Sequence, residues 1–219
     1  MPPSPTSDPA PPPSDPFRST VWITEAQRKA LHLSFIVLPL ALLYEWLPWP
    51  RGKVEWRWCL IGLTLAAIAI DVIRIHEHRT RRFFTRFFGE LIRAHERFNL
   101  LGSTYLLIAA LLAVEIFPQR VAAAALGFTI LGDGIAALVG KGWGRTRFFR
   151  KSFEGAAGGL VACVAWASFL AMAGILPWSV VLVGAGVASL VEFLPIPLDD
   201  NLGITLFAGY AMNLMWSPA

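Results

Sequence analysis

Long apolar runs are the feature of this sequence that most restricts its fold. Of the 219 residues, 55% are hydrophobic and only 16% are charged, whereas soluble domains carry about 25% charged residues. The apolar residues gather in stretches that approach the roughly 20 needed to cross a hydrocarbon layer about 30 Å thick. We therefore predict an all-α, polytopic membrane protein with about seven transmembrane helices. The predicted spans are 31–46, 57–75, 99–117, 119–139, 154–174, 178–193 and 202–217.

The N-terminal residues have a different composition. Residues 1–16 contain eight of the sixteen prolines and no large apolar side chain after Met1, so they cannot build a core. We predict a disordered, Pro-rich tail over 1–20 and a single transmembrane domain over 21–219. The sequence Thr24-Glu25-Ala26-Gln27 has the form of a capping box, which predicts a helix start at Thr24. Pro39 is expected to kink that helix.

Arginines and phenylalanines alternate between the second and third predicted spans. Residues 79–97 place Phe83, Phe84, Phe87 and Phe88 on one face of a helix, with six arginines around them. This pattern predicts an amphipathic helix in the headgroup layer. The alternative is an arginine-rich helix that binds nucleic acid. The wide apolar face and the flanking membrane spans argue against it, so no nucleic-acid partner is expected.

The distribution of basic residues predicts the orientation. Fifteen of the nineteen Lys and Arg fall on the side that holds the N-terminus, and the other side has Arg51, Lys53, Arg57 and Arg120. Cytoplasmic loops of membrane proteins carry such an excess of positive charge. We therefore expect an integral protein of the inner (cytoplasmic) membrane with a cytoplasmic N-terminus.

Acidic residues gather on the same side. They lie on or near the cytoplasmic ends of the predicted helices, at Asp71, Asp133, Glu154, Glu192, Asp199 and Asp200. An ionisable group in the middle of a span costs roughly 2.5–3.5 kcal/mol, so such groups usually mark a function. Any one of them could instead be a paired or snorkelling side chain. Together they predict a polar site at the cytoplasmic ends of the helices.

Residues 131–159 hold the densest cluster of glycines. Five basic residues and no acid lie between Asp133 and Glu154. Glycines allow backbone N–H groups to approach an anion, and basic side chains supply the countercharge. Ser152 is a candidate N-cap of the following helix. The stretch is not a Walker A loop, because Lys141 is followed by Gly142. A basic loop whose glycines serve helix packing is the alternative.

This stretch also carries a resemblance. Asp133-Gly134-x-Ala136-x-x-x-Gly140-Lys141-x-x-Gly144-Arg145, followed by Lys151-Ser152-x-Glu154-Gly155, resembles the nucleotide motif of the family of dolichol kinase, phytol kinase and CTP-dependent diacylglycerol kinase. Further matching positions are Arg28-Lys29-x-x-His32, Asp71-x-x-Arg74, Glu96 with Gly102-Ser103-Thr104-Tyr105, and Glu192 through Asn201. The resemblance covers about 25–205.

The resemblance implies CTP as phosphoryl donor, Mg²⁺ as cofactor and a membrane lipid alcohol (diacylglycerol or a polyprenol or other isoprenoid alcohol) as acceptor. It implies that Asp133, with Asp199 or Asp200, binds the metal. The implied catalytic residues are Asp71, Lys141, Lys151 and Glu192, with Asp71 or Glu192 as the possible base. The implied nucleotide-binding residues are Arg28, Lys29, Arg74, Gly140, Lys141, Gly142, Gly144, Arg145, Lys151, Ser152, Glu154 and Gly155, and the amides of 140–144 would face the triphosphate.

Two other functions remain open at this point. Phosphatidate cytidylyltransferases carry a related motif, but they also have a late His-Gly-Gly segment followed by Asp-Arg-x-Asp, and this chain has Asp199-Asp200-Asn201 in that region. A transporter or non-catalytic membrane protein would need polar groups that reach both membrane faces. The far side of this chain is almost bare of ionisable residues. The sequence therefore favours the kinase.

Overall fold

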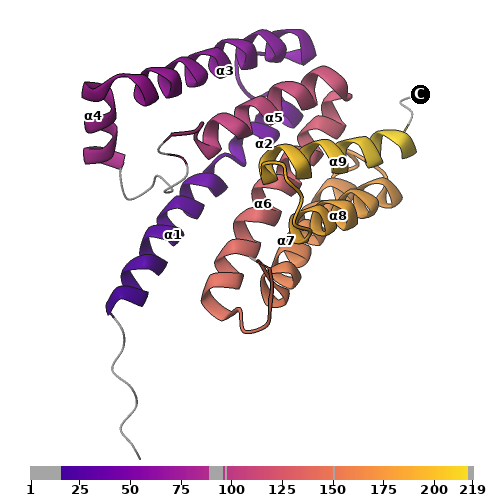
Figure 1. Ribbon diagram of the computed structural model, residues 1–219. Coiled ribbons are helices and arrows are strands. Elements are labelled where there is room, and N and C mark those ends of the chain that lie inside the picture. Colours follow the sequence, from indigo (N-terminus) through magenta and orange to yellow (C-terminus); the bar gives the residue numbers. More distant parts are fainter. Residues whose placement is uncertain (1–15, 89–95, 97, 150, 217–219) are drawn as a thin grey trace, which may run out of the picture.

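The computed structural model describes residues 16–88, 96, 98–149 and 151–216, and Figure 1 shows their arrangement. The described part is all-α apart from one short hairpin, as expected. Its elements are α1 (Pro16–Ser34), α2 (Val37–Tyr44), α3 (Gly52–His76), α4 (His78–Phe88), α5 (Gly102–Ile116), α6 (Gln119–Trp143), β1 (Arg147–Phe148), β2 (Lys151–Ser152), α7 (Phe153–Met172), α8 (Trp178–Phe193) and α9 (Asp200–Met215).

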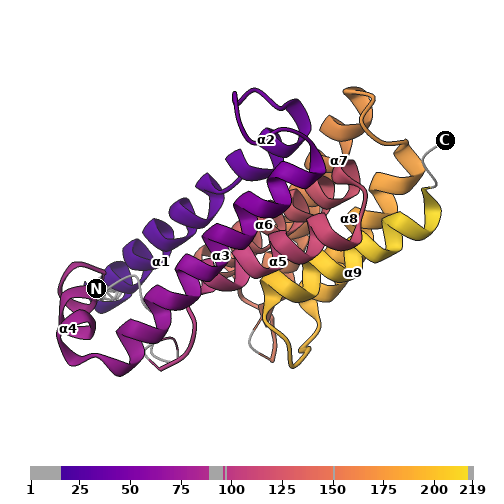
Figure 2. The ribbon, with the colours of Figure 1, turned by 90° about the horizontal axis from the view of Figure 1, so that it is seen from above.

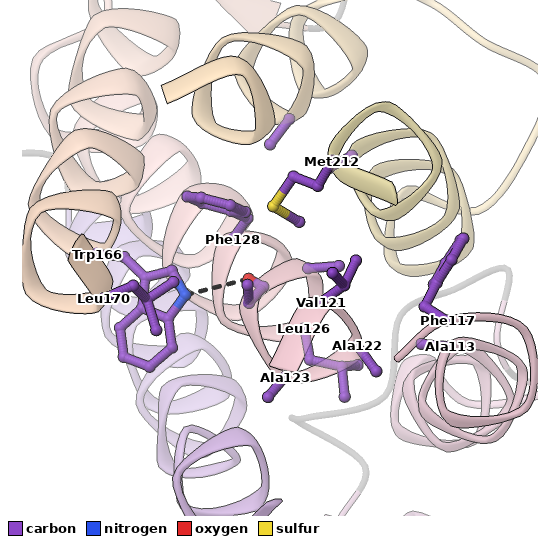
Figure 3. Packing of buried hydrophobic residues seen from close by; sticks show 14 of the residues in the cluster. Ala113, Phe117, Val121, Ala122, Ala123, Leu126, Phe128, Trp166, Leu170 and Met212 are labelled. Carbon is purple, nitrogen blue, oxygen red and sulfur yellow. Dashed lines mark hydrogen bonds between the residues drawn. The ribbon is translucent and has the colours of Figure 1, made fainter. Parts of the chain in front are cut away.

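Helix α6 forms the centre of the fold. It packs against α1, α2, α5, α7, α8 and α9, and its residues Ala122–Ala125 are fully buried. Small residues let neighbouring helices approach closely. At Gly127 an added Cβ would lie 2.2 Å from the Trp166 ring of α7. Trp166 Nε1 donates to the Ala124 carbonyl oxygen at 3.1 Å, and Phe128 and Met212 pack near this contact (Figure 3).

Among the described residues, four helical segments are long and apolar enough to cross a membrane, which indicates an integral membrane protein. They are Glu25–Tyr44, which joins α1 and α2, and helices α3, α6 and α7. The prediction of seven spans is therefore wrong. Helices α5, α8 and α9 have 15, 16 and 16 residues. At about 1.5 Å per residue they reach roughly 23–24 Å, short of a hydrocarbon layer of about 30 Å.

The first helix differs from the prediction at its start and agrees with it at the kink. Helix α1 begins at Pro16, so Thr24 lies inside the helix and does not cap it. The helix is interrupted between α1 and α2, three residues before Pro39. Proline lacks an N–H group and its ring clashes with the carbonyl four residues earlier, here that of Phe35. The predicted tail falls mostly on residues 1–15, outside the described part.

A single residue separates α4 from α3. Glu77 between them has an extended backbone (φ −98°, ψ 122°), so the chain turns and α4 does not continue the direction of α3 (Figure 1). The predicted amphipathic helix over 79–97 is confirmed as a helix up to Phe88. Its residues 89–95 and 97 lie outside the described part.

Candidate functional site

A cavity of about 300 Å³ lies between α1, α4, α5, α6 and the segment where α9 begins. Seven of its lining residues have ionisable side chains, contributed by elements far apart in the sequence: Arg28, Lys29, His32, Glu96, Asp133, Asp199 and Asp200. Five are apolar, namely Leu31, Phe35, Phe84, Leu101 and Leu106. The cavity lining therefore combines side chains suited to a charged ligand with side chains suited to hydrocarbon. We call these two sets of lining residues the charged wall and the apolar wall.

An ion pair joins α1 to α6 in the charged wall. Lys29 Nζ donates to Asp133 Oδ2 at 2.6 Å, and the Lys29 side chain is only 3% exposed. His32 Nε2 lies 3.6 Å from the same carboxylate oxygen. Lys29 and His32 are three residues apart, so they share one face of α1. Gly134 permits the close approach of α1, because a Cβ there would lie 2.6 Å from Leu33 Cδ2.

The segment before α9 supplies two carboxylates. Asp199 caps α9, and its Oδ1 accepts a hydrogen bond from the Asn201 amide at 2.9 Å. Burial raises the pKa of the Asp199 carboxyl, and burial also raises the pKa of Asp200. A buried carboxyl with a raised pKa gains from a nearby cation, because a cation favours its charged form.

Lys151 ties the hairpin to the same segment. Its Nζ lies 3.2 Å from Asp200 Oδ1 and 3.3 Å from Glu192 Oε1, and it also donates to the Glu192 carbonyl. Asp133 and Asp199 line one cavity, and Lys151 contacts Asp200 beside them. The structure thus brings the start of α9 together with α6 and the hairpin, which lie much earlier in the sequence.

Asn201 and Glu25 also belong to this region, although neither was predicted as a site residue. Asn201 is 8% exposed, and its Nδ2 donates to Asp199 Oδ1 at 3.0 Å. Its Oδ1 has no hydrogen-bond partner among the described residues. Glu25 is 5% exposed and accepts from Lys141 and Arg28. A sequence signal existed: Glu25, Arg28, Lys29 and His32 follow the i, i+3, i+4, i+7 spacing of one helix face.

The glycine-rich stretch serves helix packing. Gly140–Trp143 form the last turn of α6, and the Gly144 amide donates to the Gly140 carbonyl at 3.1 Å. At the C-terminal end of a helix, the backbone N–H groups donate to carbonyls of the preceding turn. These amides therefore do not face the cavity. A Cβ at Gly155 would lie 2.7 Å from the Ala136 carbonyl, and one at Gly144 would lie 2.7 Å from Ser152 Oγ.

Two predicted site residues form hydrogen bonds where the end of α6 meets the start of α7. Ser152 Oγ accepts from the Gly155 amide at 3.1 Å, which confirms Ser152 as the N-cap of α7. Glu154 accepts from the Thr146 amide at 3.1 Å and closes the loop before the hairpin. Gly140, Lys141, Gly142, Gly144 and Arg145 belong to the same end of α6, outside the cavity lining.

Asp71 and Arg74 form a buried ion pair outside the cavity. Asp71 Oδ1 accepts from Arg74 Nε at 3.1 Å, and the two side chains are 0% and 2% exposed. Asp71 Oδ2 accepts from the Leu101 amide and from Thr104 Oγ1, each at 2.8 Å. Arg74 donates to the carbonyls of Glu96 and Asn99. This pair therefore fixes the start of α5 against α3.

The predicted metal ligands do not form a complete protein cage. Among the described residues, no group of three or more His, Cys, Asp or Glu side chains is placed to hold a metal ion. Magnesium is commonly held by one or two carboxylates together with waters and substrate phosphates. Asp133, Asp199 and Asp200 in the cavity lining, with the Asn201 oxygen that has no partner among the described residues, supply the hard oxygen donors of that mode.

Comparison with known proteins identifies no family. No known protein-family profile and no solved structure matches this chain. One curated relative, a protein of Rickettsia prowazekii (strain Madrid E) described only as uncharacterized, is 31% identical over 134 residues. That stretch is 60% of this chain and 63% of the relative.

Proposed function

We propose that this chain is a CTP-dependent kinase that phosphorylates the hydroxyl of a membrane lipid alcohol. The observation that carries the proposal is the cavity, whose lining combines basic and carboxylate side chains with apolar ones. A lipid kinase that uses a nucleotide needs charged side chains for the phosphates and apolar side chains for the lipid. The resemblance of residues 133–155 to the dolichol, phytol and diacylglycerol kinases supplies the reaction type and the donor.

The charged wall would bind the nucleotide. A triphosphate carries nearly four negative charges, and the cavity lining includes the basic side chains of Arg28 and Lys29. Lys141 and Lys151 would add countercharge from just outside it. Asp133 with Asp199 or Asp200 would hold magnesium, which when bound neutralises charge on the phosphates and positions them. Phosphoryl transfer depends mainly on such positioning and charge neutralisation.

The apolar wall would receive the acceptor. Leu31, Phe35, Phe84 and Leu106 suit the hydrocarbon next to a lipid hydroxyl. In the transfer, the hydroxyl oxygen forms a bond to the γ-phosphorus, and the bond from that phosphorus to the β,γ-bridging oxygen breaks. CDP leaves and the hydroxyl proton is released to water. The excess of basic residues on the side of Lys29 and Lys151 favours a site at the cytoplasmic face, with the N-terminus on the same side.

CTP labelled at either of two positions tests the proposal. Purified protein is incubated with Mg²⁺, CTP labelled on the α- or the γ-phosphorus, labelled ATP, and a panel of diacylglycerol, a long polyprenol and a short isoprenoid alcohol. The kinase transfers γ-label to one of these lipids and releases CDP. Transfer of α-label with release of pyrophosphate would instead establish a cytidylyltransferase. A protein that labels none of the panel from either nucleotide would contradict the proposal.

Matched variants connect the activity to the cavity. Lys29→Met and Asp133→Asn each remove one partner of the 2.6 Å pair in the charged wall, so both are expected to abolish transfer. Arg57→Gln removes a charge from an exposed pair with Glu115 at the other end of the helices, and should retain activity. Equal activity in all three variants would show that the reaction does not take place in this cavity.

A further inference from the structure

We propose that α4 is a binding surface for anionic phospholipid headgroups. Residues 78–88 contain four arginines and no acidic residue. Arg79, Arg82 and Arg86 are exposed. Within the described part of the chain, no carboxylate lies within ion-pair distance of these three guanidinium groups. They form a concentrated positive surface that no described carboxylate neutralises.

The basic residues at the opposite end of the helices behave differently. Arg57 Nε lies 2.6 Å from Glu115 Oε2, and Lys53 Nζ donates to the Glu115 carbonyl at 3.1 Å. The Arg51 amide donates to Glu55 at 2.7 Å. Acidic residues therefore accompany the positive charges there. Among the described residues, α4 thus has three exposed arginines with no carboxylate at ion-pair distance, whereas at the opposite end Arg57 is paired with Glu115.

The position of α4 suits a membrane surface. It lies at one end of the molecule, away from α2 and the C-terminal end (Figure 2), and it packs mainly against α3. Phe83 beside the arginines is 55% exposed. A helix with exposed arginines and exposed aromatic rings lies in the interface, with its rings at the acyl boundary and its charges among headgroups. Anionic headgroups complement the charge of three exposed arginines, and a neutral headgroup does not.

The surface also adjoins the cavity. Phe84, next to Phe83, forms part of its apolar wall. Lipid bound by α4 would therefore hold one wall of the cavity at the membrane surface. The lipid-binding proposal itself does not depend on the kinase reaction, since it rests on the charge and exposure of α4.

Lipid binding to the purified full-length protein tests the proposal directly. The protein is released from micelles that contain phosphatidylglycerol or phosphatidylcholine, and bound lipids are counted by native mass spectrometry over a lipid titration. A basic side chain near an anionic surface contributes about 1 kcal/mol, or about fivefold in affinity. Changing Arg79, Arg82 and Arg86 together to Gln should therefore reduce the preference for phosphatidylglycerol by at least fivefold. Raising the salt concentration should weaken the wild-type preference in the same way.

Two further variants make the result decisive. The triple change of the same arginines to Lys keeps the charge and should keep the preference. The triple change of Arg51, Lys53 and Arg120 to Gln removes as many charges from the opposite end and should leave the preference within about twofold of wild type. Equal affinities of the wild-type protein for the two lipids would overturn the proposal. An unchanged preference in the α4 Gln variant, or an equal loss in the opposite-end variant, would also overturn it.

Discussion

The substitution Asp71→Ala tests whether Asp71 acts in the structure or in the chemistry of the protein. The Asp71 carboxylate is fully buried, and both of its oxygens accept hydrogen bonds, from Arg74, the Leu101 amide and Thr104. In Asp71→Ala the Arg74 guanidinium would remain buried and lose this carboxylate, while the carbonyls of Glu96 and Asn99 remain as acceptors. Removing one partner of a buried ion pair costs about 3–5 kcal/mol, because the remaining charge is not compensated.

This cost predicts a large change in thermal stability. For a chain of 150–250 residues, 1 kcal/mol changes Tm by about 2–4 °C, so Asp71→Ala should lower Tm by roughly 6–20 °C. The assay is intrinsic tryptophan fluorescence of the detergent-solubilised protein during heating. Arg74→Met should lower Tm similarly, and the double variant should lose less than the sum of the two, since the partners act as one unit.

Arg57→Ala provides the matched control on the same helix. Its pair with Glu115 is exposed, with side chains 37% and 50% accessible, and exposed pairs contribute about 0–1 kcal/mol. Its Tm should therefore fall by at most about 4 °C. If Asp71→Ala abolished phosphoryl transfer while its Tm stayed within about 2 °C of wild type, Asp71 would act in the chemistry, and the structural reasoning would be refuted.

Three further predictions concern the cavity, the core and the effect of pH. Asp133→Asn should lose phosphoryl transfer while still eluting as a folded protein by size exclusion; an active variant would remove Asp133 from the proposed metal site. Gly127→Ala should lower Tm, since overpacking costs about 1–3 kcal/mol, whereas Gly186→Ala, with open space around the added methyl, should not; equal shifts would contradict the packing account. Hydrogen bonds from the Gln119 side chain and the Gly52 amide lower the pKa of Glu45, so its stabilising effect is present above its ordinary pKa of about 4.3 and lost as pH falls through the lower folded value. Tm of wild type should therefore fall more steeply below about pH 4.3 than Tm of Glu45→Gln, and parallel curves would refute this.

The apolar runs predicted the helices well and the membrane spans less well. Predicted spans at 119–139 and 154–174 appear as α6 and α7, because long apolar stretches without proline leave few alternatives to a helix. Hydropathy did not distinguish a helix that crosses a membrane from a shorter one packed beside it. For α5 the apolar run began at the loop before Gly102, and that loop is held by Arg74 instead of entering the helix.

The candidate site was predictable in its charged residues and not in its packing. Arg28, Lys29, Asp133, Asp199 and Asp200 line one cavity, and all were named from the motif. The glycines of the same motif make room for a neighbouring helix. Their spacing alone does not show whether the missing side chain leaves space for a ligand or for another helix. The unpaired oxygen of Asn201 depends on its three-dimensional surroundings, which no local pattern encodes.

The short length of α5 and α8 has a consequence for the surrounding bilayer. Both are apolar, yet they reach only roughly 23–24 Å at 1.5 Å per residue. A lipid layer of about 30 Å that meets such helices must become thinner locally, at a cost of fractions of a kcal/mol per Å of hydrophobic mismatch. Lipids beside these helices would then sit deeper than their neighbours, and the protein would partition toward thin membranes over thick, sterol-rich ones.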